Sequence, residues 1–262
     1  MADATGSAFM NDGVVDILPN SKPVPQPVRM YSSPYSYSFQ AMGSDCQLTL
    51  YAEDEYRADQ AADLVMAEVW RIENKYSRYI DGNALSDINH AALAGGEVDV
   101  DDETAGLLNY AFAAFQLSEG LFDISSGALR RVWDFSSGKT PSQSAIEKIL
   151  PFIGLDKATW ASPHLHFFHP GMELDFGGVG KEYAVDRGAD ICHSMGIQSG
   201  LLDLGGDIRV LGPHPDGSPW EIGVRHPRKP DTSLGNIQLM LGAVATSATH
   251  VSSEGTLSSS PL

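Results

Sequence analysis

A glycine-rich stretch at residues 173–186 constrains the fold of this chain more than any other part of the sequence. Within seven residues it combines a carboxylate, Asp175, with three glycines and a lysine, Lys181. Glycine gives the backbone access to positive φ angles and to close contact with a ligand. A helix that begins after the glycines points free N–H groups and a partial positive charge toward them, which favours a bound phosphate. A plain strand-to-helix turn capped by Asp175 is the alternative that glycine content alone leaves open.

The composition limits the classes of protein to which the chain can belong. Its 262 residues, 42% hydrophobic and 19% charged, suit an ordinary globular protein of one large or two small domains. The net charge of −17 argues against non-specific binding of nucleic acid, because that binding needs Lys and Arg to neutralise phosphates. Any phosphate site must therefore be local, built from backbone amides, one or two cations or a metal.

The hydropathy of the sequence indicates where in the cell the protein is expected. No run of about 18 apolar residues occurs in the sequence, so we expect no membrane span. The first residues lack a basic segment followed by an apolar one, which is the pattern of a secretory signal. We therefore expect a cytoplasmic protein.

Hydrophobic periodicity indicates the order of the elements. The clearest helix spans residues 55–76, where apolar side chains recur every three or four residues and form one stripe. Met42, Gly43 and Ser44 interrupt an extended stretch at 35–52, which indicates a bulge or a ligand-facing bend. Strands and helices do not alternate strictly enough for a doubly wound parallel sheet, so we predict an α+β fold with mixed or antiparallel sheets and packed helices. Further expected elements are helices at about 102–118, 140–151 and 181–195, and strands at 165–168, 200–211, 220–224 and 237–241.

Six short motifs carry the functional signal, and each of them alone is weak. The sequence contains no nucleophile elbow, no P-loop and no GxGxxG dinucleotide fingerprint. The motifs are Ala41–Ser44, Tyr76–Tyr79, Phe122–Ser125 with Trp133, Leu174–Lys181, Asp203–Asp207 and Val244–Ser247. In their order and spacing the six motifs together resemble the FAD:protein FMN transferases, the ApbE-like flavin transferases, over residues 38–247.

The resemblance implies a fold, a reaction and a set of site residues. Such enzymes have a T-fold-like architecture, bind FAD and Mg²⁺, cleave the pyrophosphate and pass FMN to a Thr or Ser hydroxyl of an acceptor flavoprotein, and AMP leaves. Position by position, the resemblance places Gly178 beside the metal, to which it gives its carbonyl oxygen, and it indicates no catalytic base. It places seven residues on FAD: Met42, Tyr79, Leu121, Phe122, Asp123, Asp175 and Lys181.

The resemblance also predicts how the chain divides. We expect an irregular lead-in at 1–35, a flavin transferase domain at 36–247 and a Ser-rich tail at 248–262. The family pattern stops after Ser247, and the segment that completes the metal site in the family is not recognisable, so we expect a C-terminally incomplete domain from a truncated or frame-shifted gene. Two alternatives remain at this point: a noncatalytic FAD-binding protein, and an α+β scaffold whose glycines only form turns. The oligomeric state is not predicted.

Overall fold

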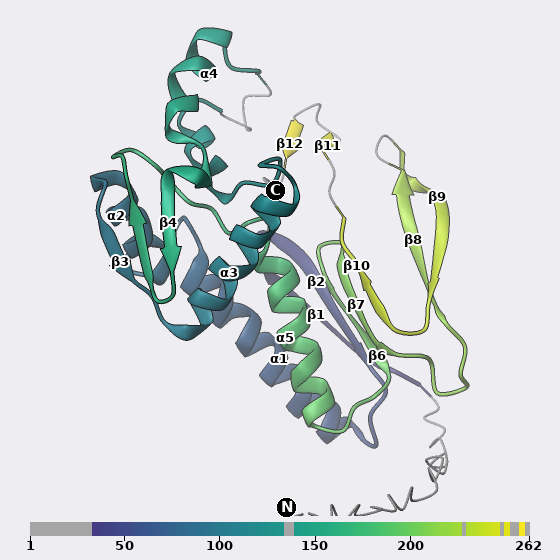
Figure 1. Cartoon of the computed structure of the whole chain (residues 1–262). Helices are drawn as coiled ribbons and strands as arrows, with labels where there is room; N and C mark the ends of the chain where they lie inside the picture. The colour runs from purple at the N-terminus through teal and green to yellow at the C-terminus, as the bar shows by residue number, and fades with distance from the viewer. Residues whose placement is uncertain (1–32, 134–138, 227–228, 247–248, 252–256, 260–262) are drawn as a thin grey trace, which may run out of the picture.

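An antiparallel sheet of five strands is the largest sheet among the described residues (Figure 1). The computed structural model describes residues 33–133, 139–226, 229–246, 249–251 and 257–259. Strands far apart in the sequence are neighbours in this sheet, and all four pairings are antiparallel. In spatial order the strands are β1 (Tyr35–Ala41), β2 (Ser44–Leu50), β6 (Gly200–Leu204), β7 (Asp207–Gly212) and β10 (Gly242–Val244).

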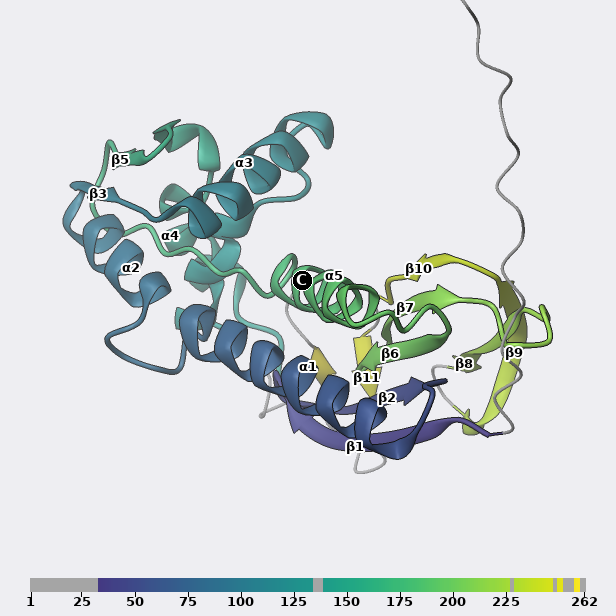
Figure 2. The same ribbon diagram turned by 90° about the horizontal axis from the view of Figure 1, so that it is seen from below.

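Two long helices, α1 (Glu55–Tyr76) and α5 (Gly180–Ser194), lie side by side over one face of this sheet (Figure 2). Gly188 of α5 allows close packing, because a Cβ there would come within 2.5 Å of the Leu202 side chain. The predicted apolar stripe of α1 is buried in this layer, which confirms the prediction: Ala58, Ala62, Val65, Val69, Ile72 and Tyr76.

A second group of smaller elements packs at the end of α1 and α5 where α1 ends and α5 begins (Figure 1). It contains a three-stranded antiparallel sheet in the order β3-β5-β4. Asp101 caps α3 by accepting a hydrogen bond from the N–H of Thr104. The elements are α2 (Ala84–Ala94), β3 (Glu97–Asp99), α3 (Asp102–Leu117), the 3₁₀ helix η1 (Ile124–Arg131), α4 (Gln143–Ile149), the 3₁₀ turns η3 (Leu150–Phe152) and η4 (Leu155–Lys157), β4 (Ala158–Ala161) and β5 (His164–Phe167).

The remaining strands form two hairpins. β8 (Trp220–His226) pairs with β9 (Lys229–Leu239) beside the main sheet. β11 (Thr249–Val251) pairs with β12 (Leu257–Ser259) inside the segment expected to be a Ser-rich tail. Most of the expected lead-in at 1–35 lies outside the described residues. Among the described residues, no helix is both long enough and apolar enough to cross a bilayer.

The predicted α+β class with antiparallel sheets is confirmed, and several local predictions change. The single strand expected at 200–211 is a hairpin of two strands, β6 and β7, and the strand expected at 237–241 is the end of the longer β9. The helix expected at 140–151 is shorter, with α4 at 143–149 followed by a 3₁₀ turn. Met42 and Gly43 make neither a bulge nor a bend within one strand. They form a two-residue turn between β1 and β2, with φ angles of 51° and 69°. Positive φ at both central residues matches the twist of a tight hairpin, which is why this turn reverses the chain.

Candidate functional site

Lys181 stands in the first turn of α5, where it meets two tight turns of the main sheet. Met42-Gly43 joins β1 to β2, and Gly205-Gly206 joins β6 to β7; because β2 and β6 are neighbouring strands, both turns lie at the same end of the sheet. The Lys181 ammonium donates a hydrogen bond to the Ser44 hydroxyl over 2.9 Å. A Cβ on Gly205 would lie 2.5 Å from the Cβ of Ser44, so glycine is required for this contact.

The first turn of α5 adds backbone donors to this corner. Val179 occupies the position before the helix, and its side chain has no oxygen to accept hydrogen bonds from the first N–H groups. A helix start without a side-chain cap keeps its partial positive charge available to an anion. Lys181 supplies a cation at the start of α5, where it interacts electrostatically with the carboxylates of Glu182 and Asp207.

Thr246 closes the same end of the sheet. Its hydroxyl donates to the carbonyl oxygen of Gly206 over 2.9 Å, and its N–H donates to Asp207 Oδ1 over 3.1 Å. Burial raises the pKa of the Asp207 carboxyl, although the N–H of Thr246 and the ammonium of Lys181 oppose the rise. The carboxylate of Asp203 accepts a hydrogen bond from the N–H of Gly206 and so shapes the turn itself.

A glutamate of α1 fixes the backbone of Met42 through a hydrogen bond. The N–H of Met42 donates to Glu73 Oε1 over 2.8 Å, and the Met42 side chain is half-buried against the core. Glu73 lies in the last turn of α1, so this hydrogen bond ties the β1–β2 turn to the end of that helix.

Asp175 and Tyr79 meet through Arg78, which lies just after the end of α1. Arg78 Nη1 donates to Asp175 Oδ2 over 2.5 Å, and Arg78 Nη2 donates to the Tyr79 hydroxyl over 2.8 Å. The second oxygen of Asp175 accepts a hydrogen bond from the N–H of Gly177 over 2.9 Å, as expected for a residue that caps a turn. The ring of Tyr79 is 79% exposed and has the Arg78 guanidinium 5.0 Å from its centroid.

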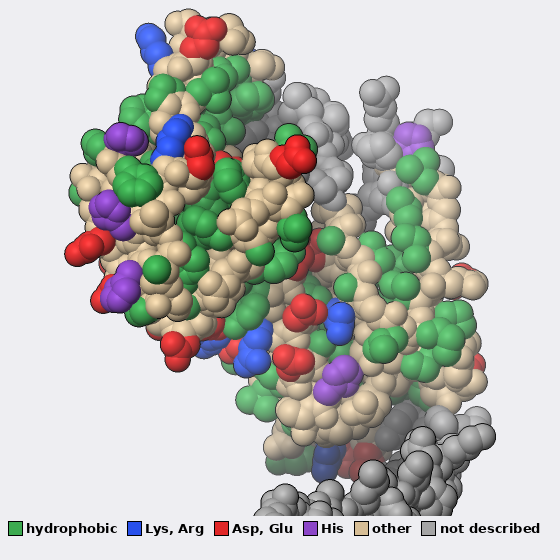
Figure 3. Space-filling model, in the orientation of Figure 1, with side chains coloured by type: hydrophobic (Ala, Val, Ile, Leu, Met, Phe, Trp, Pro, Cys, Tyr) green, Lys and Arg blue, Asp and Glu red, His purple; other side chains and the backbone are tan. Residues whose placement is uncertain are grey.

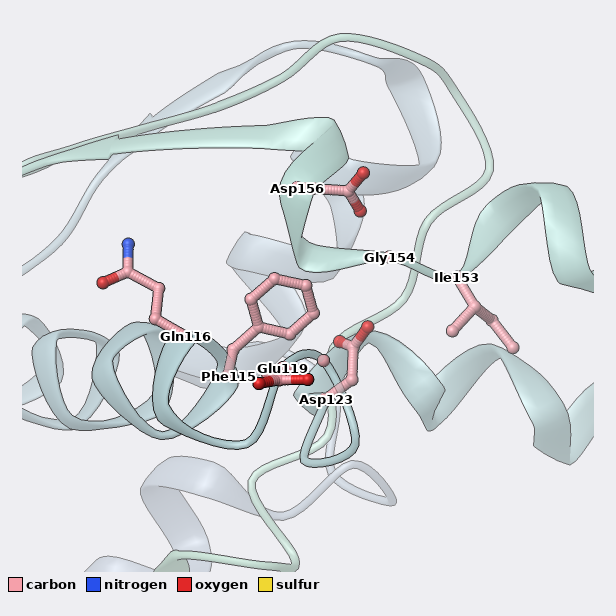
Figure 4. Close-up of a pocket in the computed structure, with 8 residues that line it drawn as sticks. Phe115, Gln116, Glu119, Asp123, Ile153, Gly154 and Asp156 are labelled. Atoms are coloured by element: carbon pink, nitrogen blue, oxygen red, sulfur yellow. The ribbon is translucent and has the colours of Figure 1, made fainter.

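Leu121, Phe122 and Asp123 lie between α3 and η1. The Asp123 carboxylate accepts hydrogen bonds from Ser125 and from the N–H of Leu155, so in this structure it fixes the loops around η1. Phe122 is half-buried, whereas Leu121 is 92% exposed. Asp123 also borders an open cavity of about 580 Å³ (Figure 4), whose lining residues are Phe115, Gln116, Glu119, Gly120, Asp123, Ile153, Gly154 and Asp156.

The segment that precedes the glycine-rich turn joins these parts. The N–H of Asp175 donates to the carbonyl oxygen of Ile124 over 2.8 Å, next to the 121–123 stretch. Gly127 packs against the backbone of residues 173–175 so closely that a Cβ there would come within 2.9 Å of a carbonyl oxygen. Asn89 of α2 forms two hydrogen bonds with the backbone of Leu174. Residues far apart in the sequence therefore converge around the ends of α1 and α5.

Comparison with known proteins identifies the family to which this chain belongs. The model of the ApbE family matches residues 42–253. The chain belongs to the ApbE family. A FAD:protein FMN transferase of Klebsiella pneumoniae is 29% identical over 229 residues, which are 85% of this chain and 66% of that protein. One from Rhodobacter capsulatus is 27% identical over 210 residues, 76% of this chain and 39% of the relative.

Solved structures of ApbE proteins have the same fold. The crystal structure of the ApbE protein from Thermotoga maritima gives a TM-score of 0.75 at 28% identity. The match covers 83% of this chain and 71% of the Thermotoga maritima chain. The apo form of the flavinyl transferase ApbE from Pseudomonas stutzeri gives a TM-score of 0.70 at 22% identity. The match covers 83% of this chain and 70% of the Pseudomonas stutzeri chain, and it supports the assignment of the fold. The α+β architecture predicted from the resemblance is therefore that of ApbE proteins.

The ApbE fold brings the residues predicted to contact FAD into two neighbouring groups. Met42 and Lys181 lie at the turns of the main sheet, and Asp175 and Tyr79 share Arg78. The 121–123 stretch joins the second group through the Asp175–Ile124 hydrogen bond. Their contact with FAD itself stays a prediction.

Sequence reasoning missed three residues that organise the site. Ser44 holds Lys181, Glu73 holds the backbone of Met42, and Arg78 holds both Asp175 and Tyr79. Ser44 and Arg78 stand inside the quoted motifs, so their positions were visible although their partners were not. Glu73 carried no signal, because a glutamate in the last turn of a helix is ordinarily a solvated side chain.

The metal prediction rests on Gly178 alone. Gly178 lies in the turn before α5, and the nearby Asp175 carboxylate is already engaged by Arg78 and Gly177. In the part of the chain that the structure describes, no group of three or more His, Cys, Asp or Glu side chains is arranged to hold a metal ion. The described residues therefore do not make up a metal cage, and the place of Gly178 beside Mg²⁺ stays a prediction.

The surface charge on one face of the molecule is mixed. On the face shown in Figure 3, the few Lys and Arg side chains lie next to Asp and Glu, and they form no broad basic patch. This pattern fits a phosphate site of local cations and backbone donors.

Proposed function

We propose that this chain acts as a FAD:protein FMN transferase, which passes FMN from FAD to a Thr or Ser hydroxyl of an acceptor flavoprotein and releases AMP. The observation that carries the proposal is the Lys181–Ser44 pair at the start of α5 beside two glycine turns, in a chain of the ApbE family. The names of its relatives support the reaction. Because the chain spans 66% and 39% of those two relatives, the activity is a proposal for this chain.

Several residues of the site carry chemical groups that suit parts of FAD. The Lys181 ammonium and the first N–H groups of α5 offset charge on the pyrophosphate. The exposed faces of Tyr79 and Leu121 offer uncovered apolar surface for a planar ring system. Asp175 keeps free lone pairs beside its two hydrogen bonds, because an ionised carboxylate has about four acceptor sites. It can therefore accept from the N–H or O–H groups of adenine, ribose or the flavin ring.

Dependence on Mg²⁺ is part of the proposal and rests on the family resemblance. When bound, Mg²⁺ would supply charge neutralisation at the pyrophosphate. It prefers oxygen ligands, keeps several waters and often binds through substrate phosphates with only one or two protein carboxylates. The carbonyl oxygen of Gly178 is the ligand that the resemblance places in the described part of the chain.

A transfer assay tests the proposal. The purified chain is incubated with FAD, MgCl₂ and an acceptor flavoprotein that carries a Thr or Ser flavinylation site. We expect flavin fluorescence on the acceptor after denaturing electrophoresis, a mass increase equal to FAD minus AMP (one FMN less one water), and equimolar release of AMP. An acceptor with that Thr or Ser changed to Ala is the control and should stay unlabelled. Labelling of both acceptors, or of neither, contradicts the proposal.

A noncatalytic FAD-binding protein is the second candidate. Its supporting observation is that the described residues contain FAD-compatible groups but no assembled metal-ligand set. The same assay separates the two functions. Retention of FAD during gel filtration, without AMP release or a labelled acceptor, identifies the noncatalytic protein.

A further inference from the structure

We propose that Arg78 is a positioning residue for FAD, which sets the orientation of Asp175 and Tyr79 as one unit. This inference rests on the proposed function, because it concerns the same cofactor site. The observation behind it is that one guanidinium donates to both side chains, over 2.5 Å to Asp175 and 2.8 Å to Tyr79.

The contact with Asp175 is largely shielded from solvent. The side chains of Arg78 and Asp175 are 11% and 9% exposed. Burial alone would lower the pKa of Arg78, but Asp175, Tyr79 and Glu173 act in the opposite direction, and the net change is a rise. A buried ion pair fixes its members more firmly than an exposed one, because water does not compete for the charges. Arg78 therefore determines which lone pairs of Asp175 remain free for a ligand.

The contact with Tyr79 orients a side chain that is otherwise exposed. The Tyr79 ring is 79% exposed, and the Arg78 guanidinium lies 5.0 Å from the ring centroid. An exposed tyrosine samples several rotamers, and each rotamer lost on binding weakens affinity. Arg78 restricts this freedom before the ligand arrives, through the hydrogen bond to the hydroxyl and the contact with the ring.

The backbone under Asp175 is held independently of Arg78. The N–H of Asp175 donates to Ile124, Gly177 donates to the Asp175 carboxylate, and Asn89 holds the Leu174 backbone through both its N–H and its carbonyl oxygen. Removal of the guanidinium should therefore release the Tyr79 side chain and leave the Asp175 carboxylate held by the Gly177 N–H alone, without displacing the chain that carries them. This separation makes the proposal testable with folded variants.

The test measures equilibrium binding of FAD, by quenching of flavin fluorescence, to the wild type and to Arg78→Ala, Arg78→Lys, Tyr79→Phe and the double variant Arg78→Ala/Tyr79→Phe. We expect Arg78→Ala to raise the Kd for FAD about tenfold, because it removes a charge-assisted contact. Arg78→Lys keeps a cation beside Asp175 but lacks the fork that reaches both partners, so a rise of about threefold is expected. Tyr79→Phe should raise the Kd about threefold in the wild type and have no effect in the Arg78→Ala background.

Arg57→Ala is the matched control. Arg57 lies in the first turn of α1, at the other end of the helix from Arg78, where it donates to the carbonyl oxygen of Met195. The control removes the same charge and should leave the Kd unchanged.

Each remaining outcome has a definite meaning. If the wild type binds FAD and Arg78→Ala binds it equally well, the positioning role is wrong and the proposed function stands. Equal effects of Tyr79→Phe in both backgrounds also overturn the positioning role, because Arg78 would then act only as structural support. Absence of FAD binding by the wild type overturns the proposed function together with this inference.

Discussion

At the scale of single residues, the phosphate site that we propose depends most on the charge of Lys181. Its ammonium lies at the start of α5 and reaches Ser44 across the β1–β2 turn. A hydrogen bond to a charged partner contributes about 1.5–3 kcal/mol, about twice the contribution of a neutral one. The Ser44 hydroxyl should therefore matter less than the ammonium that it orients.

Replacing Lys181 by Met tests this ranking. Lys181→Met removes the charge but keeps a flexible side chain of similar length, so we expect the Kd for FAD to rise about 10- to 100-fold. Ser44→Ala removes only the orienting hydroxyl and should raise the Kd about two- to fivefold. Titration of FAD at two salt concentrations measures both effects, and the loss for Lys181→Met should shrink at high salt. Lys148→Met, an exposed residue of α4, is the control, and a larger effect of Ser44→Ala than of Lys181→Met would contradict the ranking.

At the scale of elements, the sequence predicts helices better than the contacts between turns. The helices at 55–76, 102–117 and 180–194 were found from their periodicity and their start signals, because both are local properties of the chain. The Met42-Gly43 turn was not predicted, since a non-glycine residue with positive φ gives no signal of its own. The Ser44–Lys181 hydrogen bond spans 137 residues, and periodicity carries no information at that distance.

A substitution in the β6–β7 turn tests the contact between this turn and Ser44. Gly205 has a φ of 72°, and a Cβ there would come within 2.5 Å of Ser44. Gly205→Ala should therefore lower the free energy of unfolding by about 2–3 kcal/mol, of which about 1–2 kcal/mol is the cost of the left-handed backbone. It should also weaken FAD binding, because Ser44 must move away from Lys181. Urea denaturation and FAD titration measure the two effects.

Gly217→Ala is the control for that variant. Gly217 also has a positive φ, 85°, but a Cβ added there would have no atom within 4 Å. It should show the backbone cost of about 1–2 kcal/mol and leave FAD affinity unchanged. Equal effects of the two substitutions on FAD binding would show that the contact with Ser44 has no role.

At the scale of the whole molecule, an ionic cluster centred on Glu103 joins the smaller group of elements to the two long helices. Glu103 of α3 accepts hydrogen bonds from Arg71 and Lys75 of α1 and from the Tyr183 hydroxyl of α5. The sequence predicts the α+β class but not this connection. Glu103 is separated from its partners by 28 to 80 residues along the sequence. Surface Glu, Arg and Lys ordinarily indicate only a solvated face.

The acid stability of the protein should depend on this cluster. The Arg71 hydrogen bond is the largest cause that lowers the pKa of Glu103 to about 2, and Lys75 and Tyr183 add to it while burial opposes it. The pKa of this carboxyl is therefore lower in the folded than in the unfolded chain. Its contribution to stability is fully present above about pH 4.5 and is lost as the pH falls toward 2.

Glu103→Gln should accordingly lower the free energy of unfolding by about 1–2 kcal/mol at pH 7. This is less than the free energy that corresponds to the whole pKa shift of Glu103, because the Arg71 side chain is 44% exposed and solvent screens the pair. The difference between wild type and variant should shrink between pH 4.5 and pH 2, since the carboxyl of the unfolded wild type is protonated in this range while that of the folded protein stays largely ionised until about pH 2. Urea denaturation of both proteins at pH 7, 4 and 3 measures this convergence. Glu97→Gln, at an exposed position of β3, controls for the loss of one negative charge and should follow the wild type at every pH. A Glu103→Gln penalty that is constant across this range would show that packing of the side chain, rather than its charge, connects α3 to α1 and α5.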